Sequence, residues 1–215
     1  MFYGRDEYIM KEFIMKNAKM YMILSICILV GTLGVTYAYY SATVTNNTSV
    51  EGTAGGGNAP TLIVTKITTE ADGSLIPITM DTATLSKAAS ANPKCVDNRG
   101  YTACQIYSVV IRNNSNVPQS YDIELSGLSG TNTPNVDAVT MGTSNNSVTN
   151  ANSIKNNGLI CTTDSVSNGG TTTTCYFMVL IKNLDTAQTD NGTFGGTVTA
   201  TSTTGVELKA NFGTA

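Results

Sequence analysis

Residues 105 to 127, "QIYSVVIRNNSNVPQSYDIELSG", decide the fold class. The stretch opens with a β-rich run over 105–112 and continues through an Asn-rich turn that contains a proline. Behind the turn, apolar and acidic residues alternate in the order Tyr121, Asp122, Ile123, Glu124, Leu125. Alternation with a period of two residues is typical of a strand that has one buried and one solvated face. The stretch therefore predicts two strands joined by a turn.

The rest of the chain extends this pattern. Residues 175–183, "CYFMVLIKN", are apolar on both faces, which predicts a strand in the middle of a sandwich. Residues 129–157 predict a long connection with one short strand near 136–141, and no helix is predicted after residue 40. We expect an all-β protein, a jelly-roll or Ig-like β-sandwich of about eight to nine strands in residues 61–215.

An apolar segment precedes the sandwich. Residues 20–38 carry no charge and follow Lys11, Lys16 and Lys19, the order of a signal peptide or of a membrane anchor. The segment is close to the ~20 residues that span a bilayer, so its length does not separate the two. Cleavage between Ala38 and Tyr39 is the favoured interpretation, and a retained anchor over residues 1–38 is the alternative. If it is retained, only residues 20–38 contact the membrane.

Composition excludes several functions. The 215 residues carry a net charge of −3 and no basic cluster beyond the start, which argues against nucleic acid as a partner. Histidine is absent, which rules out a His-containing catalytic triad and the HExxH zinc motif. We predict a non-enzyme without cofactor or metal. Asp97, Asp185 and Asp190 lie in Asn/Gly-rich loops without EF-hand spacing and are interpreted as solvated turn residues.

Four cysteines follow the apolar segment: Cys95, Cys104, Cys161 and Cys175. An even number behind an export segment predicts two disulfides and an extracellular or cell-surface location. Three pairings are possible, and the sequential one is favoured because each pair flanks its own turn. Each closed loop would stabilise the fold by roughly 3 kcal/mol in the chain-entropy model.

Three stretches resemble one family. "GTLGVTYAYYSATVT" (31–45) is similar to the export signal of the TasA/camelysin family, which a SipW-type signal peptidase cuts. The stretch 105–127 resembles the strand, turn, strand unit of that family, and 175–212 resembles its closing strands. The resemblance implies a secreted jelly-roll subunit that assembles into extracellular fibres of a biofilm matrix. It also implies that the new N-terminus of one subunit completes the sheet of the next.

On this basis residues 39–60 are predicted to be an N-terminal strand and a Gly-rich linker. The subunit contacts would come from Tyr39, Tyr40, Ala42 and Val44, the partner being another copy of the chain. The alternative is a tethered or secreted adhesion domain that stays monomeric and resembles Cna-type pilin modules. In such a module Lys66 would form an isopeptide bond with a late asparagine such as Asn211.

Overall fold

The computed structural model of the chain describes residues 42–43, 50–53, 59–69, 74–91, 93–131, 135–184 and 193–213. The chain divides into two compact units, Met1–Tyr39 and Tyr40–Ala215. All described residues belong to the second unit, so the predicted signal or anchor helix lies outside them.

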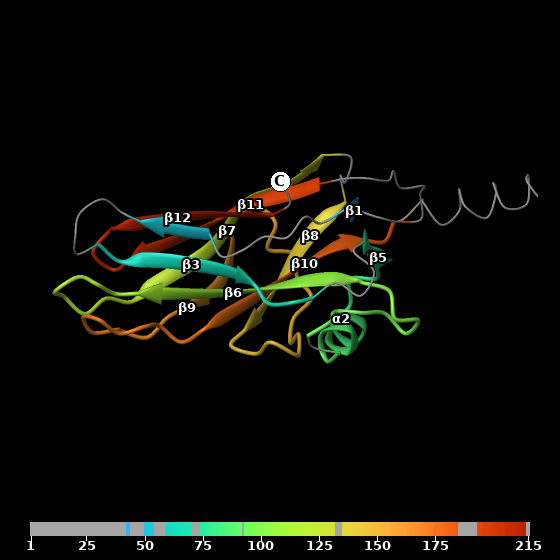
Figure 1. The fold of residues 1–215 in the computed structure, drawn as a ribbon, viewed down its shortest axis with the longest axis horizontal. Helices are drawn as coiled ribbons and strands as arrows, with labels where there is room; N and C mark the ends of the chain where they lie inside the picture. Colours follow the sequence, from blue (N-terminus) through green and yellow to red (C-terminus); the bar gives the residue numbers. More distant parts are fainter. Residues whose placement is uncertain are drawn as a thin grey trace, which may run out of the picture. The chain divides into compact units, whose positions relative to one another are not determined.

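Two large sheets pack face to face, so the prediction of an all-β sandwich is confirmed (Figure 1). The six-stranded sheet contains β2 (Val50–Thr53), β3 (Thr61–Lys66), β6 (Cys104–Arg112), β10 (Cys175–Lys182), β5 (Pro77–Ile78) and β8 (Val136–Gly142). The four-stranded sheet runs in the order β12 (Glu207–Gly213), β11 (Thr193–Ser202), β7 (Tyr121–Thr131), β9 (Gly158–Thr162). A small ribbon pairs β1 (Ala42–Thr43) with β4 (Ser74–Leu75).

The alternation read from the sequence sets the faces of the four-stranded sheet. Tyr121, Ile123 and Leu125 of β7 are buried, whereas Asp122 and Glu124 are exposed. The buried faces of both sheets form the main core, with an aromatic cluster of Tyr107, Phe177 and Phe212 whose ring centroids lie 4.9–5.2 Å apart. Such contacts between aromatic rings add to the burial of apolar area in stabilising the core.

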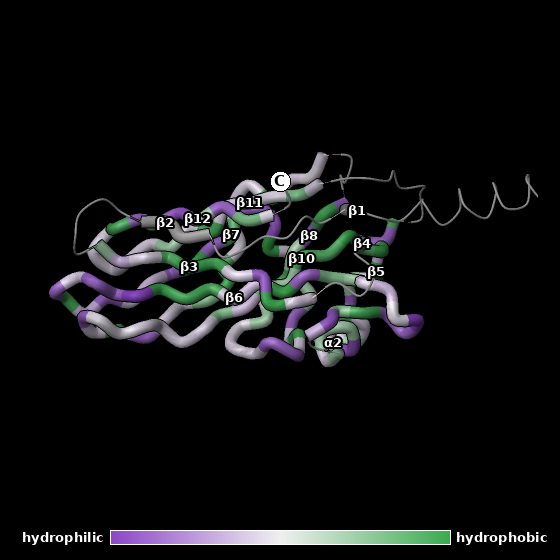
Figure 2. Tube along the Cα trace, in the orientation of Figure 1, coloured by the Kyte–Doolittle hydropathy of each residue, from purple (hydrophilic) through white to green (hydrophobic). Residues whose placement is uncertain are grey.

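Strand β10 contributes to two cores, as its two-faced apolar sequence predicted. Phe177 and Val179 face the other sheet, and Met178 and Leu180 face a second cluster on the outside. Figure 2 shows the apolar colouring that runs along β3, β6 and β10. Both faces of β10 are apolar because each is buried, one in the core between the sheets and the other in the outer cluster.

The second cluster is covered by a helix, so the prediction of no helix after residue 40 was wrong. Helix α2 (Thr82–Ala89) is capped by Asp81, whose carboxylate accepts a hydrogen bond from the Thr84 N–H at 2.9 Å. Hydrogen bonds from Thr84 hold the pKa of Asp81 below its usual value. Leu85 packs on the outer face of the six-stranded sheet. The N-cap and the two buried alanines, Ala88 and Ala89, make a short helix favourable here.

The turn behind β6 is held by Asn113, which is fully buried. Its side-chain N–H groups donate to the Val117 and Val166 carbonyls at 2.9 and 2.7 Å. Its side-chain oxygen accepts from the backbone N–H and the hydroxyl of Ser115. Asn113 therefore fixes the β6–β7 turn to the loop that precedes β10, which explains the Asn-rich sequence of this turn.

Candidate functional site

Both sequential disulfides are present. Cys161 on β9 bonds to Cys175 on β10, with a Cα–Cα distance of 6.3 Å. Because β9 belongs to the four-stranded sheet and β10 to the six-stranded sheet, this disulfide joins the two layers. The sequence predicted only that it would close its own turn. The link between the sheets could not be read from a spacing along the chain.

The other disulfide fastens the helical layer. Cys95 lies in the connection behind α2 and bonds to Cys104, the first residue of β6, with a Cα–Cα distance of 5.3 Å. Both cysteines are fully buried in the cluster under α2. The described residues therefore contain two disulfides in structural positions, which is the chemistry of an oxidising environment.

The N-terminal part of the sandwich pairs with the edge of the six-stranded sheet. Strand β2 runs antiparallel to β3, with Val50 opposite Val64, Gly52 opposite Leu62 and Thr53 opposite Thr61. The ladder makes β2 the outermost strand on this side of the sheet. The sequence missed β2, because its residues "VEGT" include Glu and Gly, which are poor strand formers.

Of the predicted subunit contacts, one residue has a described backbone position. Ala42 lies in β1, opposite Leu75 of β4. Tyr39, Tyr40 and Val44 lie outside the described residues, as does Ala38 of the predicted cleavage junction. The strand that pairs with the sheet edge is thus Val50–Thr53. The sequence placed the strand in residues 39–50 and the Gly-rich linker in residues 51–60, so most of β2 lies in the predicted linker.

The edges of the two sheets meet at β2. Strand β12, the outermost strand of the four-stranded sheet, lies beside β2, as the ribbon and the hydropathy trace both show (Figures 1 and 2). We call this boundary, formed by β2, β3 and β12, the first seam. Removing β2 would leave the N–H and C=O groups of β3 unpaired next to β12, and such an edge is a template for another strand.

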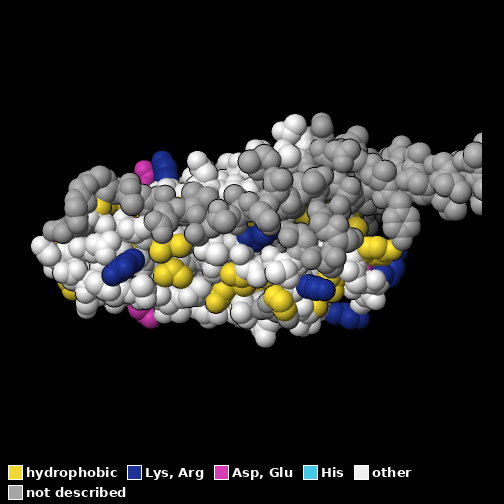
Figure 3. Space-filling model, viewed as in Figure 1, with side chains coloured by type: hydrophobic (Ala, Val, Ile, Leu, Met, Phe, Trp, Pro, Cys, Tyr) yellow, Lys and Arg dark blue, Asp and Glu magenta, His cyan; other side chains and the backbone are white. Residues whose placement is uncertain are grey.

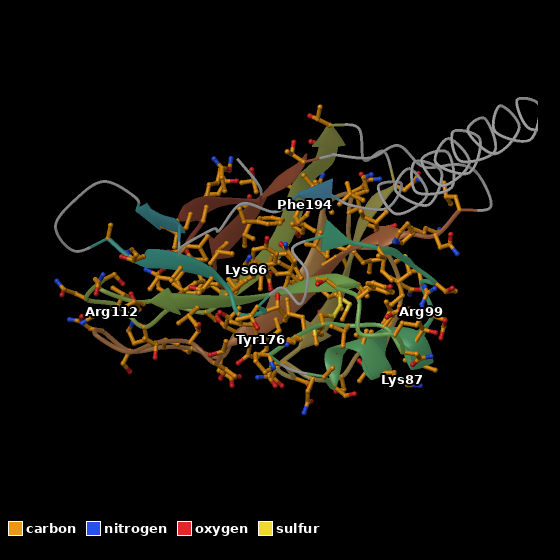
Figure 4. The ribbon with its side chains drawn as sticks, turned by 45° about the vertical axis from the view of Figure 1, so that its right-hand side comes forward. Lys66, Lys87, Arg99, Arg112, Tyr176 and Phe194 are labelled. Atoms are coloured by element: carbon orange, nitrogen blue, oxygen red, sulfur yellow. A yellow bond between two sulfur atoms is a disulfide. The ribbon has the colours of Figure 1, made fainter. Side chains whose placement is uncertain are left out.

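The two residues considered for an isopeptide bond, Lys66 and Asn211, also lie in the described part of the chain. Asn211, the asparagine considered for an isopeptide bond, is exposed on β12 and accepts a hydrogen bond from Thr197 at 2.8 Å. Lys66 is the last residue of β3, where it pairs with Tyr107 of β6, and its side chain is labelled in Figure 4. Lys66 also has an interaction partner. The side chain of Asn211 therefore lies on a solvated outer face and not in the apolar core.

Charged side chains are sparse on the face in Figure 3, where Lys and Arg are scattered among uncharged and apolar groups. Asp97 is a turn residue: its Oδ1 accepts the N–H groups of Arg99 and Tyr101, and its Oδ2 pairs with Arg99 Nε at 3.1 Å. Partial burial opposes ionisation of Asp97, but these hydrogen bonds and the Arg99 charge outweigh it and lower its pKa. Within the described residues, no cluster of three or more His, Cys, Asp or Glu side chains could hold a metal ion.

Comparison of the chain with protein-family models, curated proteins and solved structures yields no match. The resemblance to the TasA/camelysin family therefore stays a prediction. Among the described residues, no helix has both the length and the apolar character needed to cross a bilayer.

Proposed function

We propose that the chain is a secreted structural subunit that polymerises into extracellular filaments by exchanging its N-terminal strand between copies. The observation that carries the proposal is the position of β2, an outermost strand at the first seam. Residues 54–60, which include Gly55, Gly56 and Gly57, connect it to β3. A short edge strand on a Gly-rich connection can leave its own sheet and pair with the same edge of a neighbour.

Exchange of this kind breaks and remakes the same ladder. The pairing of Val50–Thr53 with Thr61–Val64 has the same register whether the two strands belong to one copy or to two. The gain in hydrogen bonding is then close to zero, and protein concentration and the strain of the connection decide which form dominates. Seven connecting residues can span at most about 25 Å, enough to reach a neighbour whose first seam lies alongside.

The disulfides support export. Both disulfides fit an oxidising compartment, and a filament outside the cell needs subunits that stay folded without chaperones. Signal peptidase would act before assembly, because residues 39–53 need a released end to reach another copy. The second candidate is an adhesion domain that stays monomeric, with β2 paired only inside its own chain.

Electron microscopy of the protein that begins at Tyr39 tests the proposal. We expect filaments whose formation depends on protein concentration, and none from a variant that lacks residues 39–53. Because the variant also loses an edge strand, a synthetic peptide of residues 39–53 is added to it. The peptide should raise the melting temperature of the variant without restoring filaments. A chain that stays monomeric at every concentration, or filaments from the deletion variant, would refute strand exchange and favour the adhesion domain.

A further inference from the structure

The sandwich has a second boundary between its sheets, on the side away from β2. Strand β8 pairs with β10 at the edge of the six-stranded sheet opposite β2, and β9 pairs with β7 in the four-stranded sheet. Both strands are outermost in their ladders, and they lie next to each other. We call the boundary between β8 and β9 the second seam. On strand order alone it would be a second place for strand addition.

The outer edge of β8 is already covered by its own chain. Val139 forms an antiparallel bridge with Ser153, and the N–H of Ile154 donates to the Ala138 carbonyl at 2.8 Å. The Ser153 hydroxyl also donates to the Asp137 carboxylate. Residues 153–154 therefore occupy the backbone groups that an incoming strand would need in the middle of β8.

The edge of β9 is held by a side chain and by a covalent bond. The Thr140 hydroxyl donates to the Ile160 carbonyl at 2.7 Å and accepts the Gly142 N–H at 3.1 Å. The next residue, Cys161, is bonded to Cys175 on β10. Strand β9 thus cannot move away from the six-stranded sheet to expose its edge while this disulfide is intact.

The first seam is built differently. Its outermost strand, β2, is held by a backbone ladder, and both disulfides lie on other strands and connections of the described chain. Opening the first seam requires the loss of one short ladder. Opening the second requires the loss of a disulfide, a bridge and the hydrogen bond to Ile160.

We propose that the Cys161–Cys175 disulfide keeps the second seam closed to strand addition. Each subunit then offers a single acceptor edge, at the first seam, to another copy of the chain. The part that concerns filaments rests on the proposed function. One acceptor and one donor per subunit give a linear, unbranched polymer, because a heterologous contact of one kind can only extend a chain or close a ring. Loss of the Cys161–Cys175 disulfide would remove the covalent part of this closure and allow β9 to move away from the six-stranded sheet. The freed edge of β9 would then be a second acceptor, and its use would cause branching or sideways aggregation.

The test compares two disulfide variants of the exported protein, expressed from the full chain. Cys161→Ala/Cys175→Ala, the seam variant, removes the covalent link across the second seam. Cys95→Ala/Cys104→Ala is the control, because it removes a loop closure of similar length that joins the connection behind α2 to β6 and does not bridge β8 and β9. Hydrogen exchange is measured across β8 and β9, and assemblies are imaged. We expect the hydrogen-exchange rates of β9 to rise by up to about a hundred-fold in the seam variant. This upper bound is the stabilisation expected from closing a loop of this length, converted to a ratio of rates. Its filaments should branch or clump, and those of the control should stay linear.

The readouts separate this inference from the proposed function. Linear filaments from the seam variant, or equal branching in the control, would overturn the closed edge while strand exchange stands. If the wild-type protein forms no filaments, strand exchange fails, and the closed edge is judged on hydrogen exchange and light scattering of the monomers. In that case faster exchange and faster aggregation of the seam variant support it, and rates equal to those of the wild-type protein refute it.

Discussion

Replacing Asn113 by alanine tests whether its side-chain hydrogen bonds fix the turn between β6 and β7. The substitution removes two donated and two accepted side-chain hydrogen bonds, of 2.6–3.0 Å, from a fully buried position. The Val166 carbonyl keeps the Gln119 N–H as a donor, and the Ser115 hydroxyl, released from Asn113, can donate to the Val117 carbonyl. Because these acceptors stay partly satisfied, the loss should lie below the sum of four buried bonds, at about 2–3 kcal/mol.

Two matched variants separate the network from a general effect of losing an asparagine. Asn114→Ala removes the neighbouring amide, which is only part-buried and donates to Ala59 and Thr61, and should cost under about 1 kcal/mol. Asn113→Asp keeps the shape but turns a donor toward two carbonyls into an acceptor, so it should destabilise at least as much as alanine.

Urea unfolding followed by circular dichroism gives the free energy of unfolding of each variant, and an unchanged m-value shows that the transition stays comparable. Hydrogen exchange at Gly169, whose N–H donates to the Asn113 carbonyl, reports on the loop before β10. A stability of Asn113→Ala within about 0.5 kcal/mol of the wild-type protein would refute the role of this network, since that is the range of neutral surface changes. An equal loss in Asn114→Ala would do the same.

Three further substitutions test the core, the sheet contact and the acid response. Tyr121→Phe should stabilise the protein by about 1 kcal/mol in urea unfolding, because the phenol oxygen is buried without a hydrogen-bond partner in the described structure, and a loss of stability would contradict this. Burial raises the pKa of Tyr121, so the unfolded state loses this proton first and the free energy of unfolding falls as pH rises above about 10. The alkaline limb of thermal melting should therefore be flatter in Tyr121→Phe. Gly196→Ala would place a Cβ 2.9 Å from two ring atoms of Phe212, and should cost about 1–3 kcal/mol of unfolding free energy; an unchanged midpoint would show that the ring moves freely. The pKa of Asp97 is lowered, so the stability that its carboxylate contributes is present above about pH 4 and is lost as pH falls through the folded-state pKa. Asp97→Asn should therefore lose less stability than the wild-type protein between about pH 5 and 2. Identical acid limbs of the two stability curves would show that Asp97 does not contribute to acid unfolding.

Local periodicity was enough to predict the strands that carry the main core. The alternation around Ile123 and the two-faced apolar run around Met178 each correspond to one position in a sheet, so the pattern determines the environment. The sequential disulfide pairs were predicted for a similar reason, since each pair flanks one turn.

The features that were missed depend on contacts between distant segments. Helix α2 is eight residues long, and Asp81 as N-cap is a weak local signal for it. The helix owes its stability to packing on Ile106, Met178 and Leu180, which lie far from it in the sequence. Strand β2 forms because β3 offers an edge to "VEGT". That Cys161 and Cys175 belong to different sheets depends on strand order, which a spacing along the chain does not encode.

The most direct test of strand exchange is a cross-link between two variants that each carry one added cysteine beside the native disulfides. Glu51 of β2 lies opposite Ile63 of β3, so Glu51→Cys and Ile63→Cys are introduced in separate chains, mixed and oxidised mildly. Thr199→Cys mixed with Lys209→Cys is the control, because β11 and β12 are register partners joined by a tight connection within one chain. Strand exchange predicts a covalent heterodimer from the first mixture and none from the second. Monomers alone in the first mixture, under conditions in which the Glu51→Cys/Ile63→Cys double variant closes its own disulfide, would contradict the account.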